Sequence, residues 1–161
     1  MDTVSAIMPA LLDHPVVELV KRCEGWYDRP YLCPAGKWTI GYGHLCAKDH
    51  PPITREQGDA LLRDDLTIAV RAVLRHAPLL AREPLHRLAA LMSWTFNLGE
   101  GNQKSSTMLR RILEKEWEAA AREMTRWNKA TVNGVKKVLP GLVKRRRCEA
   151  HLFRTGEVVL F

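Results

Sequence analysis

The stretch from residue 26 to residue 44 limits the possible folds most, because it lies between segments of clear helical periodicity and breaks that pattern. Prolines and glycines divide it into short pieces rich in Tyr, Trp, Thr and Ile. Pro34-Ala35-Gly36 is typical of a turn between two strands. We therefore predict a β-hairpin or a small three-stranded sheet here. One small sheet among helices indicates the α+β class.

Helical patterns precede and follow this stretch. Val16, Leu19, Val20 and Cys23 recur at three- and four-residue spacing and predict a first helix that stops at Gly25. After the sheet, Thr54 and Gln57 have the form of a capping box. They open a long amphipathic helix that we place at residues 54–76.

Three more helical segments complete the chain. Glu83-Pro84 starts one that runs to Phe96 and stops at Gly99. Ser105 or Ser106 caps the next, whose apolar face continues to Trp127 with a kink on the way. Pro140 starts the last helix, over residues 141–154.

These elements predict a mostly helical α+β fold with two lobes and a cleft between them. The β-rich lobe covers about residues 26–50, and the helical lobe covers about 77–161 and packs with the first helix, 15–24. The long helix joins the two lobes, and residues 1–161 form one domain. A cleft between lobes is the usual place for a ligand, and Glu24 lies at this junction.

The chain carries a formal net charge of +7, from 25 basic and 18 acidic residues. This excess favours polyanionic partners such as nucleic acid, an anionic membrane face or the acidic polymers of a bacterial wall. Composition does not choose among them. The one dense basic run is Lys144-Arg145-Arg146-Arg147.

The four cysteines are Cys23, Cys33, Cys46 and Cys148, and no two of them form a C-x-x-C pair. That spacing argues against a zinc site, and the number is too small for a disulfide scaffold. We expect reduced thiols, no bound metal and no cofactor.

The apolar run at residues 4–12 is short, contains Pro9 and follows Asp2 rather than a basic residue. It lacks the length of a membrane span and the basic start of a signal peptide. We expect neither in this chain.

The sequence around Glu24 resembles that of the bacteriophage-type lysozymes, or endolysins, which cleave bacterial peptidoglycan. A Glu followed by Gly, then W-T-I-G-Y-G-H at residues 38–44, carries the resemblance. Segments 93–112 and 126–146 also resemble the family, so that the match covers about residues 15–155. Three blocks in the family's order make it specific. The family fold, a small β lobe and a helical lobe joined by a long helix, agrees with the elements above.

The resemblance implies hydrolysis of the β-1,4 bond between N-acetylmuramic acid and N-acetylglucosamine. Such a reaction needs a proton donor on the leaving oxygen and a group on the opposite face of the sugar. The family motif has Glu, eight residues, usually Asp, five residues, then Thr; here these positions hold Glu24, Cys33 and Thr39. Glu24 fits the general acid, and Thr39 fits a residue that orients water, although a β-branched residue also simply fills a strand.

Cys33 departs from the family pattern. A thiol with an ordinary pKa of about 8.5 is mostly neutral at pH 7, whereas Asp is charged. Three alternatives stay open: a partly ionised thiolate that replaces Asp as base or nucleophile, a passive substitution, or a weakened site. A fourth alternative is redox control through a disulfide between Cys33 and either Cys23 or Cys46.

The resemblance implies further site residues in the helical part. Arg145 matches an arginine that approaches the catalytic Glu, with Arg146 as the neighbouring candidate. Asn97 and Trp127 match positions that line the cleft, and Tyr42 is a candidate for sugar contact; core packing is the alternative for Trp127 and Tyr42. The sequence indicates no catalytic-triad or metal partner for His44 or the other histidines.

Peptidoglycan is therefore the expected substrate, with anionic wall polymers as a second partner; we expect no nucleic-acid ligand and a monomer. The family implies that such a protein stays in the host cytoplasm until a holin releases it. Two other functions stay open: a module that holds peptidoglycan without cutting it, and a basic nucleic-acid binder that would leave residues 23–44 unexplained. A transglycosylase product stays open as well.

Overall fold

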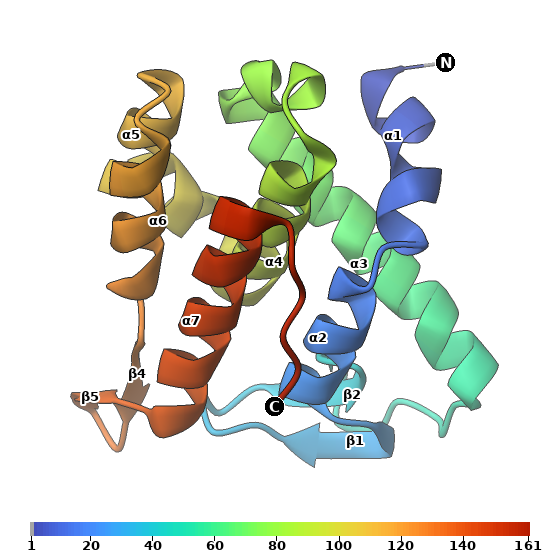
Figure 1. The fold of residues 1–161 in the computed structure, drawn as a ribbon. Coiled ribbons are helices and arrows are strands. Elements are labelled where there is room, and N and C mark those ends of the chain that lie inside the picture. Colours follow the sequence, from blue (N-terminus) through green and yellow to red (C-terminus); the bar gives the residue numbers. More distant parts are fainter. Residues whose placement is uncertain (1) are drawn as a thin grey trace.

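The computed structural model describes residues 2–161 and shows a mostly helical molecule with a small sheet at one end (Figure 1). The elements are α1 (Thr3–Leu12), α2 (Val16–Glu24), β1 (Tyr27–Leu32), β2 (Trp38–Gly41), β3 (His44–Leu45), α3 (Arg55–His76), the 3₁₀ helix η1 (Pro78–Arg82), α4 (Leu85–Ser105), α5 (Thr107–Leu113), α6 (Trp117–Thr125), β4 (Lys129–Val132), β5 (Val135–Val138) and α7 (Pro140–Thr155). The predicted α+β, mostly α fold is confirmed.

The predicted sheet is three-stranded and antiparallel, in the order β1-β2-β3. Tyr31 pairs with Thr39 and Leu32 with Trp38. The turn between these strands is closed by the Cys33 N–H, which donates to the Lys37 carbonyl at 2.9 Å. The sheet lies beneath the ends of α2 and α7 in Figure 1. Cys33, which stands where the family usually has Asp, therefore lies at the start of a tight turn.

Helix α2 ends as the sequence predicts. Val16, Leu19 and Val20 are fully buried. Gly25 then has φ of 73°, a backbone conformation that glycine adopts without steric cost. Glu24 is consequently the last residue of the helix, directly before the chain turns into β1.

Helix α3 joins the sheet to the helical part and contacts β2, α1 and α4. Its 22 residues give a length of about 33 Å. The predicted capping box is confirmed, because the Gln57 N–H donates to the Thr54 hydroxyl at 3.1 Å and the Thr54 N–H donates to the Gln57 side chain at 2.9 Å.

Helix α4 is the central helix of the core, and Leu88, Leu91 and Trp94 on it are fully buried. Gly99 interrupts it with φ of 86°, as predicted, but a further helical stretch continues to Ser105. Ser106 then caps α5 by accepting from the Leu109 N–H at 3.0 Å.

The expected kink before Trp117 is a full break between α5 and α6. Lys115 has φ of 58° there, and the two helices pack against each other. Helix α7 follows and starts at Pro140.

Helix α1 and the hairpin β4–β5 were not predicted. Asp2 caps α1 by accepting from the Ser5 N–H at 2.8 Å, and Pro9 lies inside this helix. Asn133 and Gly134 both have positive φ in the hairpin turn, which an Asn-Gly pair strongly favours. Among residues 2–161, no single helix is long and apolar enough to cross a membrane. Helices α1 and α2 reach the required length and hydropathy only when they are taken together, and a bend of 75° separates them.

The main core forms one cluster to which all seven α-helices contribute, together with Tyr42 from the sheet region. Trp26, next to the sheet, packs against this cluster. Its ring reaches Gly58 of α3 so closely that a Cβ there would lie 2.2 Å from the ring. Trp26, directly before β1, thus packs the start of the sheet against the long helix.

We expect Gly58→Ala to lower the free energy of unfolding by about 1–3 kcal/mol, the usual cost of overpacking. Gly101→Ala is the matched control, because it is also helical but a Cβ there meets nothing within 4 Å. This second change should be neutral or stabilise by up to about 1 kcal/mol. Urea unfolding of both variants measures the difference, and equal midpoints would contradict the packing argument.

Candidate active site

The carboxylate of Glu24 is held by a buried arginine. Arg145 of α7 donates from Nη1 to Glu24 Oε2, and the two side chains are 3% and 17% exposed. The two residues are 121 positions apart in the chain. Glu24 therefore has a fixed orientation and retains limited access to solvent.

The turn after β2 packs directly against the same carboxylate. A Cβ placed on Gly43 would lie 2.5 Å from Glu24 Oε1, so only glycine fits at this contact. Gly43 also has φ of 75°, which disfavours other residues. The sheet region and the end of α2 meet at this point.

A cavity of about 370 Å³ opens beside Glu24. Its wall includes Glu24, Pro34, Asn97, Leu142, Arg145 and Phe161. Pro34 follows Cys33 in the turn of the sheet, whereas the others come from helices and from the segment after α7. The structure thus brings Glu24, Asn97 and Arg145 together at one cavity, as the sequence predicts.

Arg145 is itself held by a second buried carboxylate. Its Nε donates to Glu149 Oε2 at 3.2 Å, and its Nη2 donates to the Ser93 carbonyl at 3.3 Å. The Ser93 hydroxyl donates to Glu149 Oε2 at 2.6 Å. Although burial lowers the pKa of Arg145, Glu24 and Glu149 together raise it above its ordinary value. The guanidinium therefore stays charged and shared between two acids.

Arg146 points away from Glu24 and supports Asn97. Its Nη2 donates to Asn97 Oδ1 at 2.9 Å and to Glu149 Oε2 at 3.2 Å. Its Nε lies 2.7 Å from Glu149 Oε1, a close ion pair whose geometry falls short of a hydrogen bond. Burial lowers the pKa of Arg146, and Glu149 opposes this. Lys144 and Arg147 are exposed, so that the basic run divides into two buried and two solvated residues.

Cys33, in the turn after β1, lies close to Thr39 of β2. The Thr39 side chain is 3% exposed, and its hydroxyl donates to the Lys37 carbonyl at 3.0 Å. Burial raises the pKa of Cys33, but the backbone N–H groups of Lys37 and Ala35 and the Thr39 hydroxyl outweigh this and lower it below its ordinary value. Neither residue is part of the cavity wall, which their neighbour Pro34 reaches.

The other three cysteines are less acidic thiols. Burial raises the pKa of Cys23 to about 11, and it also raises the pKa of Cys46 and Cys148. All four thiols are free. Thiolate character is thus concentrated at Cys33, the position where the family usually has Asp.

Tyr42 and Trp127 are placed differently from Asn97. Tyr42 is 8% exposed, its ring lies 5.0 Å from that of Trp26, and its hydroxyl accepts from Arg55 at 3.3 Å. Trp127 packs edge-on against Trp94 at 5.5 Å, and its carbonyl accepts from Arg146 at 3.4 Å. Neither side chain lines the cavity beside Glu24, so both support the site through packing.

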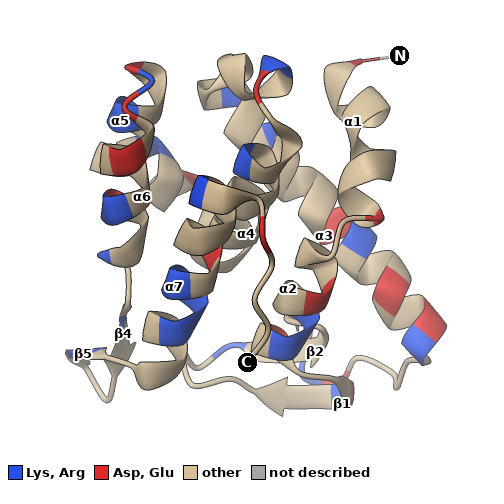
Figure 2. Cartoon of the chain, viewed as in Figure 1, with Lys and Arg blue, Asp and Glu red and all other residues tan. Residues whose placement is uncertain are grey.

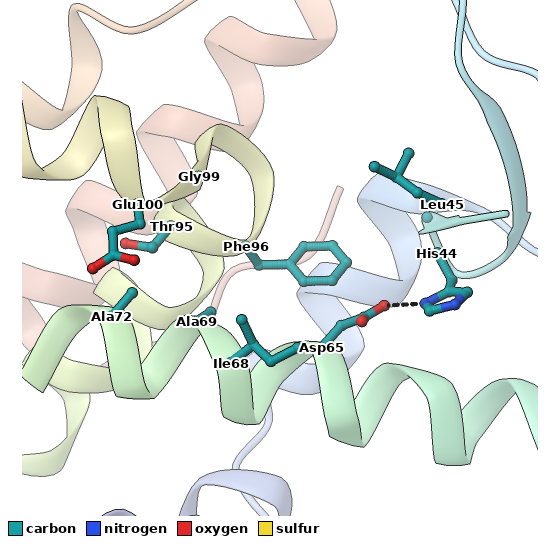
Figure 3. A pocket seen from close by; sticks show the side chains of 11 residues that line it. His44, Leu45, Asp65, Ile68, Ala69, Ala72, Thr95, Phe96, Gly99 and Glu100 are labelled. Atoms are coloured by element: carbon teal, nitrogen blue, oxygen red, sulfur yellow. Dashed lines mark hydrogen bonds and ion pairs between the residues drawn. The ribbon is translucent and has the colours of Figure 1, made fainter.

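A second cavity of about 290 Å³ lies beyond Gly43, between α3, α4 and the sheet (Figure 3). Leu45, Ile68 and Phe96 form its apolar wall. His44 meets Asp65 of α3 at 2.7 Å there, a contact that the sequence did not indicate. Gly43 belongs to this wall and touches Glu24, so the carboxylate stands between the two cavities.

A glutamate at the junction of a small sheet and a helical part, with cavities on both sides, agrees with the family resemblance. The family model of phage lysozyme matches residues 21–149 of the chain. The chain belongs to the phage lysozyme family.

Individual relatives support this membership. An endolysin of Acyrthosiphon pisum secondary endosymbiont phage 1 is 38% identical over 86% of this chain and 94% of its own length. An endolysin of Bacillus phage B103 is 39% identical over 88% of this chain, which spans about half (53%) of that relative. The muramidase domain of SpmX from Asticaccaulis excentricus is 37% identical, with a TM-score of 0.77 over 89% of this chain and 97% of that structure.

The sequence analysis did not identify two residues, Glu149 and Ser93, that bind Arg145 in this site. Glu149 and Ser93 are buried and bind Arg145, yet neither belongs to the three motif residues. The spacing in the predicted last helix could have indicated Glu149, because it follows Arg145 by four residues and Arg146 by three, and side chains at these spacings meet on a helix. Nothing in the local sequence pointed to Ser93.

We expect Cys33 to react with iodoacetamide before Cys46 when the pH is raised from 6 to 10. The pKa of Cys33 is lowered, so its thiolate forms at lower pH, whereas the pKa of Cys46 is raised. Cys46 is the internal control, because both thiols are partly exposed. Peptide mass spectrometry of the alkylated protein follows both residues, and an earlier reaction of Cys46 would contradict this order.

Proposed function

We propose that this phage lysozyme is an endolysin that hydrolyses the β-1,4 bond between N-acetylmuramic acid and N-acetylglucosamine in peptidoglycan. The observation that carries the proposal is the Glu24 carboxylate, held by Arg145 at the wall of a cavity. Family membership supports the class of enzyme, a glycoside hydrolase. Residues 1–161 would act as one catalytic domain and as a monomer.

Glu24 is the proposed general acid, which protonates the oxygen of the leaving sugar. A cation that served Glu24 alone would favour its ionised form and weaken it as an acid. Arg145 also binds Glu149, so its charge is divided between two carboxylates. The arginine thus orients the Glu24 carboxyl while it stays bound to the buried Glu149.

Cys33 and Thr39 are the groups that we propose to act on the face of the sugar opposite Glu24. The lowered pKa of Cys33 favours a thiolate that replaces Asp as base or nucleophile. The Thr39 hydroxyl has one proton, which points to the Lys37 carbonyl in this structure and would turn to the sulfur to stabilise that thiolate. In either orientation its oxygen keeps lone pairs that can accept from a water molecule.

The positive charge of the chain suits a wall that carries acidic polymers. A net charge of +7 would concentrate the protein on such a surface, and salt would weaken this attraction through screening. We place the action at the bacterial cell wall, after release from the host cytoplasm by a holin, as the family resemblance implies.

Replacing Cys33 by Asp should keep lytic activity within about tenfold, because the carboxylate restores the family's charge at this position. Cys33→Ala should lose about 10²-fold or more, the scale of a general base. Both rates are measured by clearing of a wall suspension, with Cys46→Ala as the control for a change of thiol elsewhere. Full activity of Cys33→Ala would exclude a catalytic thiol.

Glu24→Gln should lower the rate of wall clearing by about 10²- to 10⁴-fold, because the amide cannot donate the proton. Mass spectrometry of the products should show new reducing ends on N-acetylmuramic acid, whereas an anhydro product would indicate a transglycosylase. If wild type and Glu24→Gln bind walls equally and neither cuts them, the chain is a binding module.

A further inference from the structure

Strand β1 contains a bulge shortly after Glu24. Tyr27 pairs with Gly41 and Tyr31 pairs with Thr39, so a step of four residues along β1 matches a step of two along β2. Directly paired residues share a face of a sheet, so both tyrosines lie on the face that carries the Thr39 side chain. Bulges re-aim side chains in this way and are frequent next to active sites.

Backbone contacts fix this bulge in place. The Ile53 N–H, from the segment before α3, donates to the Asp28 carbonyl at 3.0 Å. Pro30 has no N–H to offer a neighbouring strand, and it suits a bulge on an edge strand. The charged residues of β1, Asp28 and Arg29, lie near its start, and the rest of the strand is uncharged (Figure 2).

The two tyrosine rings stack on each other across the bulge. Their centres are 3.6 Å apart, and the ring planes differ by 23°. In a regular strand, residues four apart would lie about 13 Å from each other. A Cβ placed on Gly25 would lie 3.6 Å from the Tyr27 ring, so this ring lies against the residue that follows Glu24. The stack therefore extends from the end of α2 to the position opposite Thr39.

The phenol of Tyr31 lies within electrostatic range of both Glu24 and Cys33. Burial raises the pKa of Tyr31, and the negative charges of Tyr27, Glu24 and Cys33 raise it further. The phenol therefore stays protonated at neutral pH. Tyr31 contributes a ring and a neutral hydroxyl to this part of the site, and no charge.

The separation between the acid and the opposing group decides how a glycoside hydrolase works. Two carboxyl groups about 5–5.5 Å apart give a covalent route, whereas about 6.5–9.5 Å leaves room for a water molecule. A misplacement of about 1 Å can cost about 100-fold in rate. Gly43 limits how closely the turn after β2 approaches Glu24. The tyrosine stack lies on the other connection between α2 and the sheet, along β1.

We propose that Tyr31 is a positioning residue for the hydrolysis. Its ring, stacked on Tyr27, keeps Cys33 and Thr39 at a fixed distance from the Glu24 carboxyl. The bulge in β1 brings the second ring into place for this contact. This inference rests on the proposed function, because it concerns the placement of the same three reacting groups.

The test compares Tyr31→Leu with Tyr31→Phe in the full chain. A soluble wall fragment serves as substrate, and the release of sugar reducing ends gives kcat and KM. Tyr31→Leu should lower kcat by about 10- to 100-fold, because the stack that places the reacting groups is lost. KM should stay nearly unchanged. Tyr31→Phe should restore most of kcat, because its ring still stacks on Tyr27.

Two results of this comparison would overturn the proposal. A higher KM with unchanged kcat in Tyr31→Leu would make the ring a sugar contact. An equal loss of kcat in Tyr31→Phe and Tyr31→Leu would assign the effect to the hydroxyl instead of the stacked ring.

Leu32→Ala is the matched control. Leu32 follows Tyr31 directly, is 56% exposed and pairs with Trp38, so its side chain lies on the opposite face of the sheet. This variant should keep the kcat of the wild type. An equal loss of kcat in Leu32→Ala would mean that any truncation in β1 disturbs the sheet, and the specific role of Tyr31 would be wrong.

The reactivity of Cys33 separates positioning from a loss of local structure. Tyr31→Leu should leave unchanged the pH at which Cys33 reacts with iodoacetamide, because the backbone N–H groups of Lys37 and Ala35 remain beside the thiol. A shift of this pH toward that of an ordinary thiol would show that the turn itself has loosened, and would contradict the positioning role.

The rate of the wild-type protein separates this inference from the proposed function. An active wild type with an equally active Tyr31→Leu variant would overturn the inference alone. If the wild type released no sugar ends from the wall fragment, the proposed function would fail and the inference with it.

Discussion

The structure depends on a buried ion-pair network in which two arginines share one glutamate. Arg145 and Arg146 are at most 3% exposed, and Glu149 between them is fully buried. Removing such ions from water costs several kcal/mol each, and loss of one partner from a buried pair costs about 3–5 kcal/mol. The network joins α2 through Glu24 and α4 through Asn97 to α7, and it therefore fixes the helices and the proposed acid together.

The two proposed sides of the reaction come from different parts of the fold. Glu24 belongs to the helical network, whereas Thr39 lies on β2 of the small sheet and Cys33 in the turn between β1 and β2. The sheet uses backbone N–H groups and one hydroxyl to favour a thiolate. A thiolate and the carboxylate of Asp carry the same charge, and the proposed replacement of the usual family residue rests on this equality.

Local patterns predicted the sheet, the Thr54 capping box and the break at Gly99, because each depends on residues a few positions apart. They missed α1, since Pro9 was taken to interrupt a run that a helix tolerates. They could not choose between Arg145 and Arg146, because the choice depends on contacts across more than 100 residues, such as that of Arg145 with Glu24. The Asn133-Gly134 turn was visible in the sequence and predicts the hairpin that was overlooked.

Contacts between residues far apart in the chain also explain why Tyr42 and Trp127 match the family and yet line no part of the cavity beside Glu24. Both are large, amphipathic side chains, and sequence does not distinguish a ring that faces a cleft from one packed behind it. Their burial is decided by neighbours such as Trp26 and Trp94, which come from other elements.

The contact between Gly43 and Glu24 has a mechanical consequence. Every ion-pair partner of Glu24 and Arg145 lies on a helix, so the glycine is the point at which the sheet region meets this network. A side chain at position 43 would collide with the Glu24 carboxylate and push either the acid or the turn out of place. The spacing between the sheet and the proposed acid is therefore set by the absence of a single Cβ atom.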